Sequence, residues 1–130
     1  MKFIADLHIH SKYSRATSKD MNLESLAEWA RIKGIKVLGT GDFTHPEWFK
    51  EIKNKLEPAE SGLLKLKKDK GEFTRFILTA EISCIYSKAG RVRKVHVLIF
   101  APSVGVVEKI NTYLDKIGNI KSDGRPILGL

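Results

Sequence analysis

The stretch Met1-Lys2-Phe3-Ile4-Ala5-Asp6-Leu7-His8-Ile9-His10 opens the chain as an apolar run that ends on two histidines. Such a run predicts a β-strand, in which alternate side chains point to the same face. Asp6, His8 and His10 would then share one face, and two imidazoles about 7 Å apart along a strand can close on one divalent metal ion. The alternative is a strand whose histidines only form hydrogen bonds. We expect a metal site at the end of this strand.

The segments after residue 10 carry alternating loop, helix and strand signals. In chain order they predict a loop over 11–20, a helix from Asn22 to about Lys33, a strand over Ile35–Thr40, a helix from Pro46 to Leu56, a β-hairpin over 75–101 and a helix from Ser103 to Ile117. Asn22 and Gly34 have the residue types of a helix start and stop, and Gly90 marks the hairpin turn. Residues 57–72 and the tail 119–130 lack a clear period, so we expect connections and turns there. This order predicts an α/β fold whose sheet is parallel at least in part.

Length and cysteine content narrow the class of protein. The chain has 130 residues, of which 42% are hydrophobic, and this predicts one globular domain over residues 1–130. Cys84 is the only cysteine, which excludes an internal disulfide and fits a reducing cytoplasm. No apolar run approaches the length of a membrane span, and the N-terminus lacks the pattern of a secretory signal. We therefore expect a cytoplasmic protein without a membrane partner.

The charge of the chain points to a class of partner. Lys and Arg number 23 against 15 Asp and Glu, so the formal net charge is +8. This excess favours a polyanionic partner such as DNA, with a solvated basic surface as the alternative. Four cations crowd the tip of the predicted hairpin: Lys88, Arg91, Arg93 and Lys94. They either contact a nucleic acid backbone or guard a strand edge against unwanted pairing.

Each predicted strand carries or precedes a side chain that can bind a metal ion. Asp42, with His45 nearby, follows the second strand, Glu81 lies within the third and His96 within the fourth. Taken alone, Asp42 and His45 fit a turn and a helix start, Glu81 fits a solvated sheet face and His96 fits an ordinary hydrogen-bonded histidine. Their coincidence with the first two histidines favours one shared metal site. Mixed imidazole and carboxylate ligands suit zinc, manganese or iron.

Arg15 and Cys84 are two further side chains that could belong to the site. Arg15 follows the histidine pair, where it either holds a phosphate or is an exposed loop residue. Cys84 stands three residues after Glu81 and so on the opposite face of its strand, which predicts core packing rather than metal binding.

Three segments of the chain resemble the PHP (polymerase and histidinol phosphatase) domain family, and within it the endonuclease Q-like proteins. They are Asp6-Leu-His-Ile-His-Ser-Lys-Tyr-Ser-Arg15, Gly39-Thr-Gly-Asp-Phe-Thr-His-Pro46 and Ser122-Asp-Gly-Arg-Pro-Ile-Leu-Gly129, so the resemblance extends over the whole chain. It implies a distorted seven-stranded β/α barrel with a trinuclear metal site at its mouth. It also implies nicking of DNA on the 5′ side of deaminated or missing bases through metal-activated water.

The resemblance assigns a role to most of the candidate residues. His8 and His10 would bind the first metal ion, and Asp42 occupies a position at which many PHP proteins have a histidine ligand. Glu81 would be the bridging and catalytic carboxylate, and His96 a ligand of another metal ion. The role of Arg15 comes from its position after the histidine pair and not from the resemblance: it would hold the DNA backbone as a second catalytic residue. The complete family site takes two to three divalent transition metal ions, and the resemblance assigns no role to His45.

The chain departs from the family pattern after His96. The family completes its site with a further histidine and an Asp-x-His motif downstream, and this sequence has no histidine beyond His96. We therefore expect a partial (β/α)7-type PHP barrel, about half the usual strands, with a β-hairpin. An open barrel edge favours a homo-oligomer or a complementing second chain.

The sequence is compatible with three functions. The first is a metal-dependent phosphoesterase that acts on DNA, the second a catalytically incomplete metal- or DNA-binding subunit, and the third a phosphatase of small phosphate esters. The net charge of +8 favours a polymeric substrate over a small ester. The absent downstream ligands favour the second function over the other two.

Overall fold

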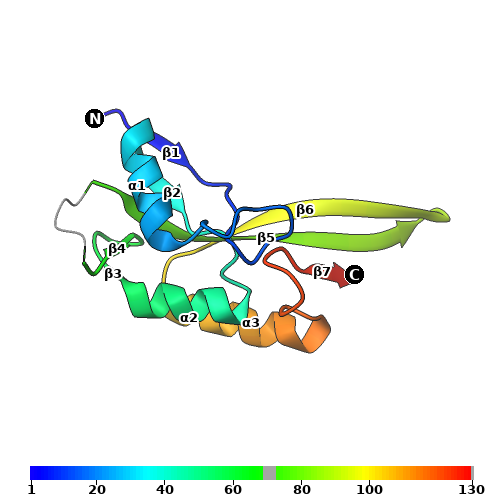
Figure 1. Cartoon of the computed structure of the whole chain (residues 1–130). Coiled ribbons are helices and arrows are strands. Elements are labelled where there is room, and N and C mark those ends of the chain that lie inside the picture. The colour runs from blue at the N-terminus through cyan, green and yellow to red at the C-terminus, as the bar shows by residue number, and fades with distance from the viewer. Residues whose placement is uncertain (69–72, 130) are drawn as a thin grey trace.

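The computed structural model of the chain describes residues 1–68 and 73–129 (Figure 1). The described residues form a mixed α/β fold, with helices and strands that alternate in the first half. The elements in chain order are β1 (Ile4–Asp6), α1 (Leu23–Lys33), β2 (Ile35–Gly39), α2 (Pro46–Lys55), β3 (Leu56–Pro58), β4 (Leu64–Leu66), β5 (Arg75–Lys88), β6 (Arg91–Ala101), α3 (Val104–Ile117) and β7 (Ile127–Gly129). None of these helices has the length and apolar character needed to cross a membrane.

β5 is the central strand of a seven-stranded sheet. The sheet has the order β1-β2-β5-β4-β3, and β6 and β7 also pair with β5. β2 and β7 run parallel to β5, whereas β4 and β6 run antiparallel to it. The expectation of a partly parallel sheet is confirmed. The finer expectation of a partial barrel stays a prediction.

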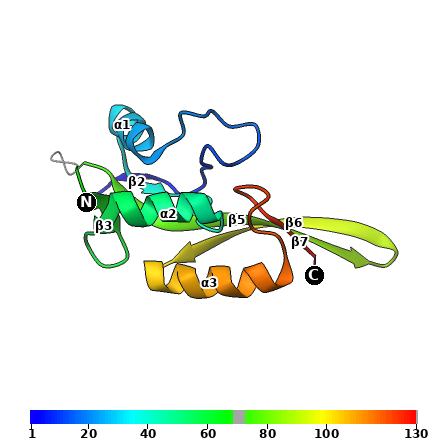
Figure 2. The same cartoon turned by 60° about the horizontal axis from the view of Figure 1, so that its bottom comes forward.

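β5 and β6 form the predicted hairpin. Their register runs without interruption from Leu78 opposite Ala101 to Lys88 opposite Arg91. Ala89 and Gly90 make the two-residue turn with φ angles of 53° and 71°. Positive φ at both positions is typical of the primed turns that match the twist of paired strands. The outer part of the hairpin extends well beyond the helices (Figures 1 and 2).

The helices begin and end where the sequence predicts. The Asn22 side chain accepts a hydrogen bond from the Ser25 backbone N–H at 2.9 Å, and Gly34 ends α1 in the left-handed region with φ of 75°. Ser103 starts α3 in the same way, because its hydroxyl accepts from the Val106 N–H at 3.3 Å. α2 and α3 lie side by side (Figures 1 and 2) and are joined by an ion pair between Lys53 and Glu108 at 3.8 Å.

Two expectations about connecting segments are wrong. Residues 57–72 were expected to be a connection, yet β3 and β4 pair within them; residues 69–72 lie outside the described part of the chain. The tail 119–130 was expected to contain only turns, yet β7 pairs in parallel with Ser83–Ile85 of β5. A three-residue strand is too short to show a hydrophobic period, and it forms because a longer strand offers it unpaired backbone groups.

Trp48 joins the core to the loop that follows β2. It is fully buried in a cluster to which α1, α2, α3, β2 and β5 all contribute. Its indole N–H donates to the carbonyl oxygens of Thr40 and Gly41 at 3.2 and 3.0 Å. The apolar packing of α2 therefore also positions the backbone just before Asp42.

We expect Trp48→Phe to destabilise the protein by about 2 kcal/mol, because two buried carbonyl groups lose a donor and the core loses ring volume. Urea unfolding followed by circular dichroism measures this change. Trp29→Phe is the matched control, since Trp29 is 60% exposed, and we expect little effect from it. Equal effects of the two substitutions would contradict the role assigned to Trp48.

Candidate metal centre

His8 and His10 lie on the segment that follows β1 rather than on the strand itself. β1 ends at Asp6, and the chain continues across the ends of β1 and β2. This path needs glycine at Gly39 and Gly41, since a Cβ at Gly39 would lie 2.9 Å from the Leu7 carbonyl oxygen and one at Gly41 would collide with the Ile9 carbonyl. The two imidazole rings end up 5.5 Å apart between their centres. The strand prediction is thus wrong for the histidines, although the expected convergence of their rings is found.

Glu81 collects three histidines around one buried carboxylate. The residue lies within β5 and is 4% exposed. One oxygen, Oε2, lies 2.8 Å from His8 Nε2 and 2.9 Å from His10 Nε2. The other oxygen, Oε1, lies 2.9 Å from His96 Nδ1. The two oxygens of Glu81 therefore face histidines from different parts of the chain.

The pKa of Glu81 shows how its charge is accommodated. Burial by itself raises the pKa, but the hydrogen bond from His8 and the charges of His8, His10 and Arg125 outweigh it, so the pKa lies below its ordinary value. Arg125 contributes from a distance of 4.0 Å between its guanidinium and Oε1. Glu81 is thus held as a carboxylate, the form that binds a metal ion.

Asp42 forms a second buried carboxylate behind His10. It has a φ of 50°, and its Oδ1 lies 2.9 Å from His10 Nδ1. Its Oδ2 accepts from the backbone N–H and the hydroxyl of Ser11, both at 2.6 Å, and from the Ser14 hydroxyl at 2.9 Å. Burial raises the pKa of Asp42, and these hydrogen bonds lower it further than burial raises it. The hydrogen bond to Asp42 is also the largest cause of the raised pKa of His10.

His8, His10 and Glu81 form a group able to hold a metal ion. One ligand atom from each lies within 4.8 Å of the others. Two imidazole nitrogens and a carboxylate oxygen are ligands that zinc, manganese and iron accept. Asp42 touches this group through the far nitrogen of His10, the usual place of a carboxylate that orients a histidine ligand. Direct metal binding by Asp42 and by His96 stays a prediction.

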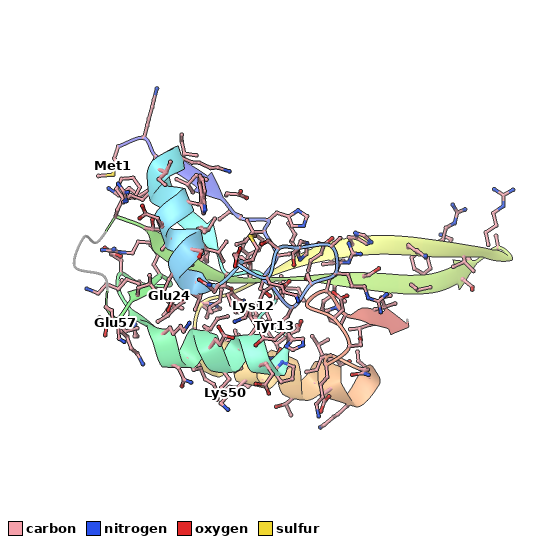
Figure 3. All side chains as sticks on the ribbon, in the orientation of Figure 1. Met1, Lys12, Tyr13, Glu24, Lys50 and Glu57 are labelled. Carbon is pink, nitrogen blue, oxygen red and sulfur yellow. The ribbon has the colours of Figure 1, made fainter. Side chains whose placement is uncertain are left out.

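The remaining candidates, Arg15, His45 and Cys84, contact other residues than those of this group. Arg15 is 88% exposed, and its Nε lies 3.2 Å from Asp123 Oδ2. His45 precedes α2 and stacks on Tyr13, with 4.4 Å between ring centres, and burial lowers its pKa. Tyr13, which Figure 3 labels, donates its hydroxyl hydrogen to Glu51 Oε1 at 2.9 Å. Cys84 packs beside the apolar cluster of Ile82, Leu114, Ile120 and Leu128, in agreement with its predicted structural role.

The sequence did not predict the serines or the C-terminal residues that complete the centre. Ser11 and Ser14 bind Asp42, while Gly124 packs against both Asp42 and Ser14. A cavity of about 150 Å³ opens beside the centre, with Arg15 and Arg125 among its lining residues together with His10, Ser14, Ser122 and Asp123. The segment Ser122–Gly129 was singled out by the resemblance, but neither period nor spacing gave its residues a role.

We expect Gly124→Ala to disturb the centre, because a Cβ at this position would collide with the Asp42 carboxylate and the Ser14 hydroxyl. Overpacking of this kind costs about 1–3 kcal/mol, which urea unfolding measures. Gly129→Ala is the matched control, since a Cβ there meets no atom within 4 Å. If both variants unfold at the same urea concentration, the close packing of Gly124 on Asp42 does not matter for stability.

Comparisons with known proteins bear on the fold and on the sequence as a whole. No family model matches the chain. An uncharacterized protein of Methanocaldococcus jannaschii is 38% identical over 122 residues, which are 93% of this chain and 13% of that protein. The crystal structure of a lesion-specific endonuclease from Pyrococcus furiosus matches 97% of this chain with 35% sequence identity and a TM-score of 0.80. The structure of an endonuclease Q complex with a 27-mer duplex, which has an abasic lesion at the active site, matches with the same values. This chain spans 29% of those endonuclease chains. Over nearly all of its length, the chain is therefore similar in structure to endonuclease Q.

Proposed function

We propose that the chain is a PHP-type, endonuclease Q-like phosphoesterase that uses divalent metal ions to nick DNA beside deaminated or missing bases. One observation carries the proposal: the two carboxylate oxygens of Glu81 face different histidines, with His8 and His10 on one side and His96 on the other. A carboxylate placed in this way suits a bridge between two metal ions. We assign Glu81 this role, and His8, His10, Asp42 and His96 as the other ligands.

The donor set fits the group that the proposal requires. Imidazole nitrogens and carboxylate oxygens converge on one region, and Glu81 is held in its charged form. Two to three divalent transition metal ions, zinc, manganese or iron, would supply activation of water and neutralisation of charge on a phosphate. Asp42 holds the His10 ring in one orientation through Nδ1, which leaves Nε2 directed at Glu81.

Two arginines beside the centre support a role in binding phosphate. Arg15 and Arg125 both line the cavity of about 150 Å³ beside the centre. Guanidinium groups bind phosphate oxygens through paired hydrogen bonds, so these residues suit a role in holding the DNA backbone. Arg15 is largely exposed, and its Nε lies 3.2 Å from Asp123 Oδ2 at the same cavity. We propose Arg15 and Glu81 as catalytic residues.

Charge and similarity favour DNA over a small phosphate ester. The net charge of +8 suits a polyanion, and endonuclease Q has been crystallised with a 27-mer duplex that carries an abasic lesion. A DNA substrate brings many phosphates to a basic surface, whereas a small ester brings one. The phosphatase of small esters therefore remains only as an outcome of the test below.

Metal binding tests the ligand assignment. We expect the purified protein to bind zinc, manganese or iron, and His8→Ala and Glu81→Gln each to weaken binding by more than the roughly 10- to 100-fold that loss of an outer-shell partner costs, because each removes a direct ligand. Isothermal titration calorimetry measures the affinities. His45→Ala is the matched control, since His45 stacks on Tyr13 outside the group and should leave the affinity unchanged. A protein that binds none of zinc, manganese and iron would rule out the proposed function.

Nicking tests the reaction. We expect the protein with manganese or zinc to cut duplex DNA that contains deoxyuridine, hypoxanthine or an abasic site, on the 5′ side of the lesion. His8→Ala should reduce the rate at least about 100-fold if the metal centre supplies activated water, whereas His45→Ala should keep the rate. Denaturing gel electrophoresis of end-labelled strands measures both. Hydrolysis of p-nitrophenyl phosphate without nicking would instead identify a phosphatase of small esters.

The second candidate is a metal- and DNA-binding subunit without its own activity. The observation in its favour is that the chain spans 29% of the endonuclease chains it matches. In that case the protein would bind metal and DNA but cut neither damaged nor intact duplex. Nicking would then need a homo-oligomer or a complementing second chain, and adding that chain would restore it.

A further inference from the structure

We propose that the basic arm, defined as residues 85–95 at the outer end of the β5–β6 hairpin, binds the sugar-phosphate backbone of duplex DNA that reaches the metal centre. This inference rests on the proposed function, because it names a surface that would hold its substrate. It concerns residues outside the centre.

The arm carries charge of one sign only. Its cations are Lys88, Arg91, Arg93 and Lys94, and the sequence has no Asp or Glu between Glu81 and Glu108. All four side chains are exposed, and within residues 1–68 and 73–129 none of the four has an acidic partner at ion-pair distance. Unpaired cations gathered on one element form the usual electrostatic surface for a phosphate backbone.

The arm is a regular and projecting element. The pairs of β5 and β6 continue to Lys88 opposite Arg91, and the turn closes with two residues. Figures 1 and 2 show the hairpin leaving the body of the protein, and Figure 3 shows side chains at its tip standing clear of the helices. A two-stranded ribbon of this kind can lie along DNA without moving the rest of the fold.

The register of the hairpin links the arm to the metal centre. Ser83 pairs with His96, and His96 meets Glu81, so these three residues lie on one face of the hairpin. Lys94 is two residues from His96 and therefore on the same face, about 7 Å further along the strand. A DNA strand that places a phosphate at Glu81 and His96 would pass Lys94 next. Lys94 thus extends the centre along this face, whereas Lys88, Arg91 and Arg93 project from the other face of the ribbon. A ribbon that enters a groove of the duplex meets backbone on both of its sides, so the cations of both faces can contact phosphates.

Protection of the strand edge is the competing explanation. Among residues 1–68 and 73–129, β6 pairs with β5 alone, and it exposes Val92, Val95 and Val97, so its other edge could pair with a second copy of the chain. Charge of either sign would prevent such pairing, and natural edges use both lysine and acidic residues. All four charges here are positive, in a stretch without acidic residues. This one-sided charge favours a polyanion as the occupant.

Salt-dependent DNA binding tests the arm. The probe is a fluorescein-labelled duplex of about 20 base pairs that contains one abasic site, titrated with the full chain in EDTA at several KCl concentrations and followed by anisotropy. The arm variant replaces the four cations by alanine (Lys88, Arg91, Arg93 and Lys94). The slope of log K against log salt is negative, and we expect its magnitude to decrease by about 2–4, since each lost phosphate contact removes about 0.9.

The matched control removes the same charge from the other end of the molecule. It replaces four exposed lysines by alanine: Lys2, Lys33, Lys36 and Lys50. Lys50 lies on α2, away from the arm (Figure 3). We expect the control to change the slope by less than about 1. Circular dichroism checks that both variants fold. If the fourfold arm variant does not fold, the single variants Lys94→Ala and Arg91→Ala should each decrease the magnitude of the slope by about 0.9.

Several results would overturn the inference. An unchanged slope in the arm variant, or equal losses in the arm variant and the control, would show that the arm makes no specific contribution. A change in oligomeric state by sedimentation without a change in DNA binding would identify the arm as a contact between copies. The assay needs no metal and no cleavage, so loss of nicking with intact arm-dependent binding would reject only the proposed function.

Discussion

The buried charge of Glu81 is the constraint on which the candidate centre depends. A carboxylate inside a protein costs several kcal/mol unless cations or hydrogen-bond donors surround it. Glu81 obtains these partners from His8, His10 and His96 at 2.8–2.9 Å, with Arg125 at 4.0 Å. The segment after β1, the hairpin and the C-terminal segment must therefore all reach β5. The same set of contacts that satisfies the charge creates a group of metal ligands.

Asp42 adds a second constraint to the first. It is fully buried with a left-handed φ of 50°, and its oxygens bind His10, Ser11 and Ser14. His10 lies between the two carboxylates, with Nδ1 on Asp42 and Nε2 on Glu81. An imidazole held at both nitrogens has one orientation, which is what a preorganised metal ligand requires. The packing of Trp48 against the preceding carbonyl groups supports this loop from the core.

Much of the fold and some of the centre could be predicted from local patterns. The start of α1 at Asn22 and its end at Gly34 depend on neighbouring residues, so the pattern was sufficient. β7 could not be predicted, because its three residues form a strand only against Ser83–Ile85. The side chains of His8, His10, Glu81 and His96 were expected together because each predicted strand carries or precedes a possible metal ligand. Ser14 and Arg125 were not expected at the centre, since serine and arginine in loops fit many roles.

The three helices, the longer strands, the chemical types of the candidate ligands and the basic charge of the hairpin could all be predicted from the sequence, because they depend on residues close together in the chain. The short strands β3, β4 and β7 and the contacts between side chains depend on tertiary pairing. His8 and Glu81 are 73 positions apart, and their contact depends on the parallel register of β1, β2 and β5. Glu81 Oε1 meets His96, whereas Oε2 meets His8 and His10. The contact with His96 depends on the register that places His96 opposite Ser83. Register is a property of paired strands, so no single segment contains it.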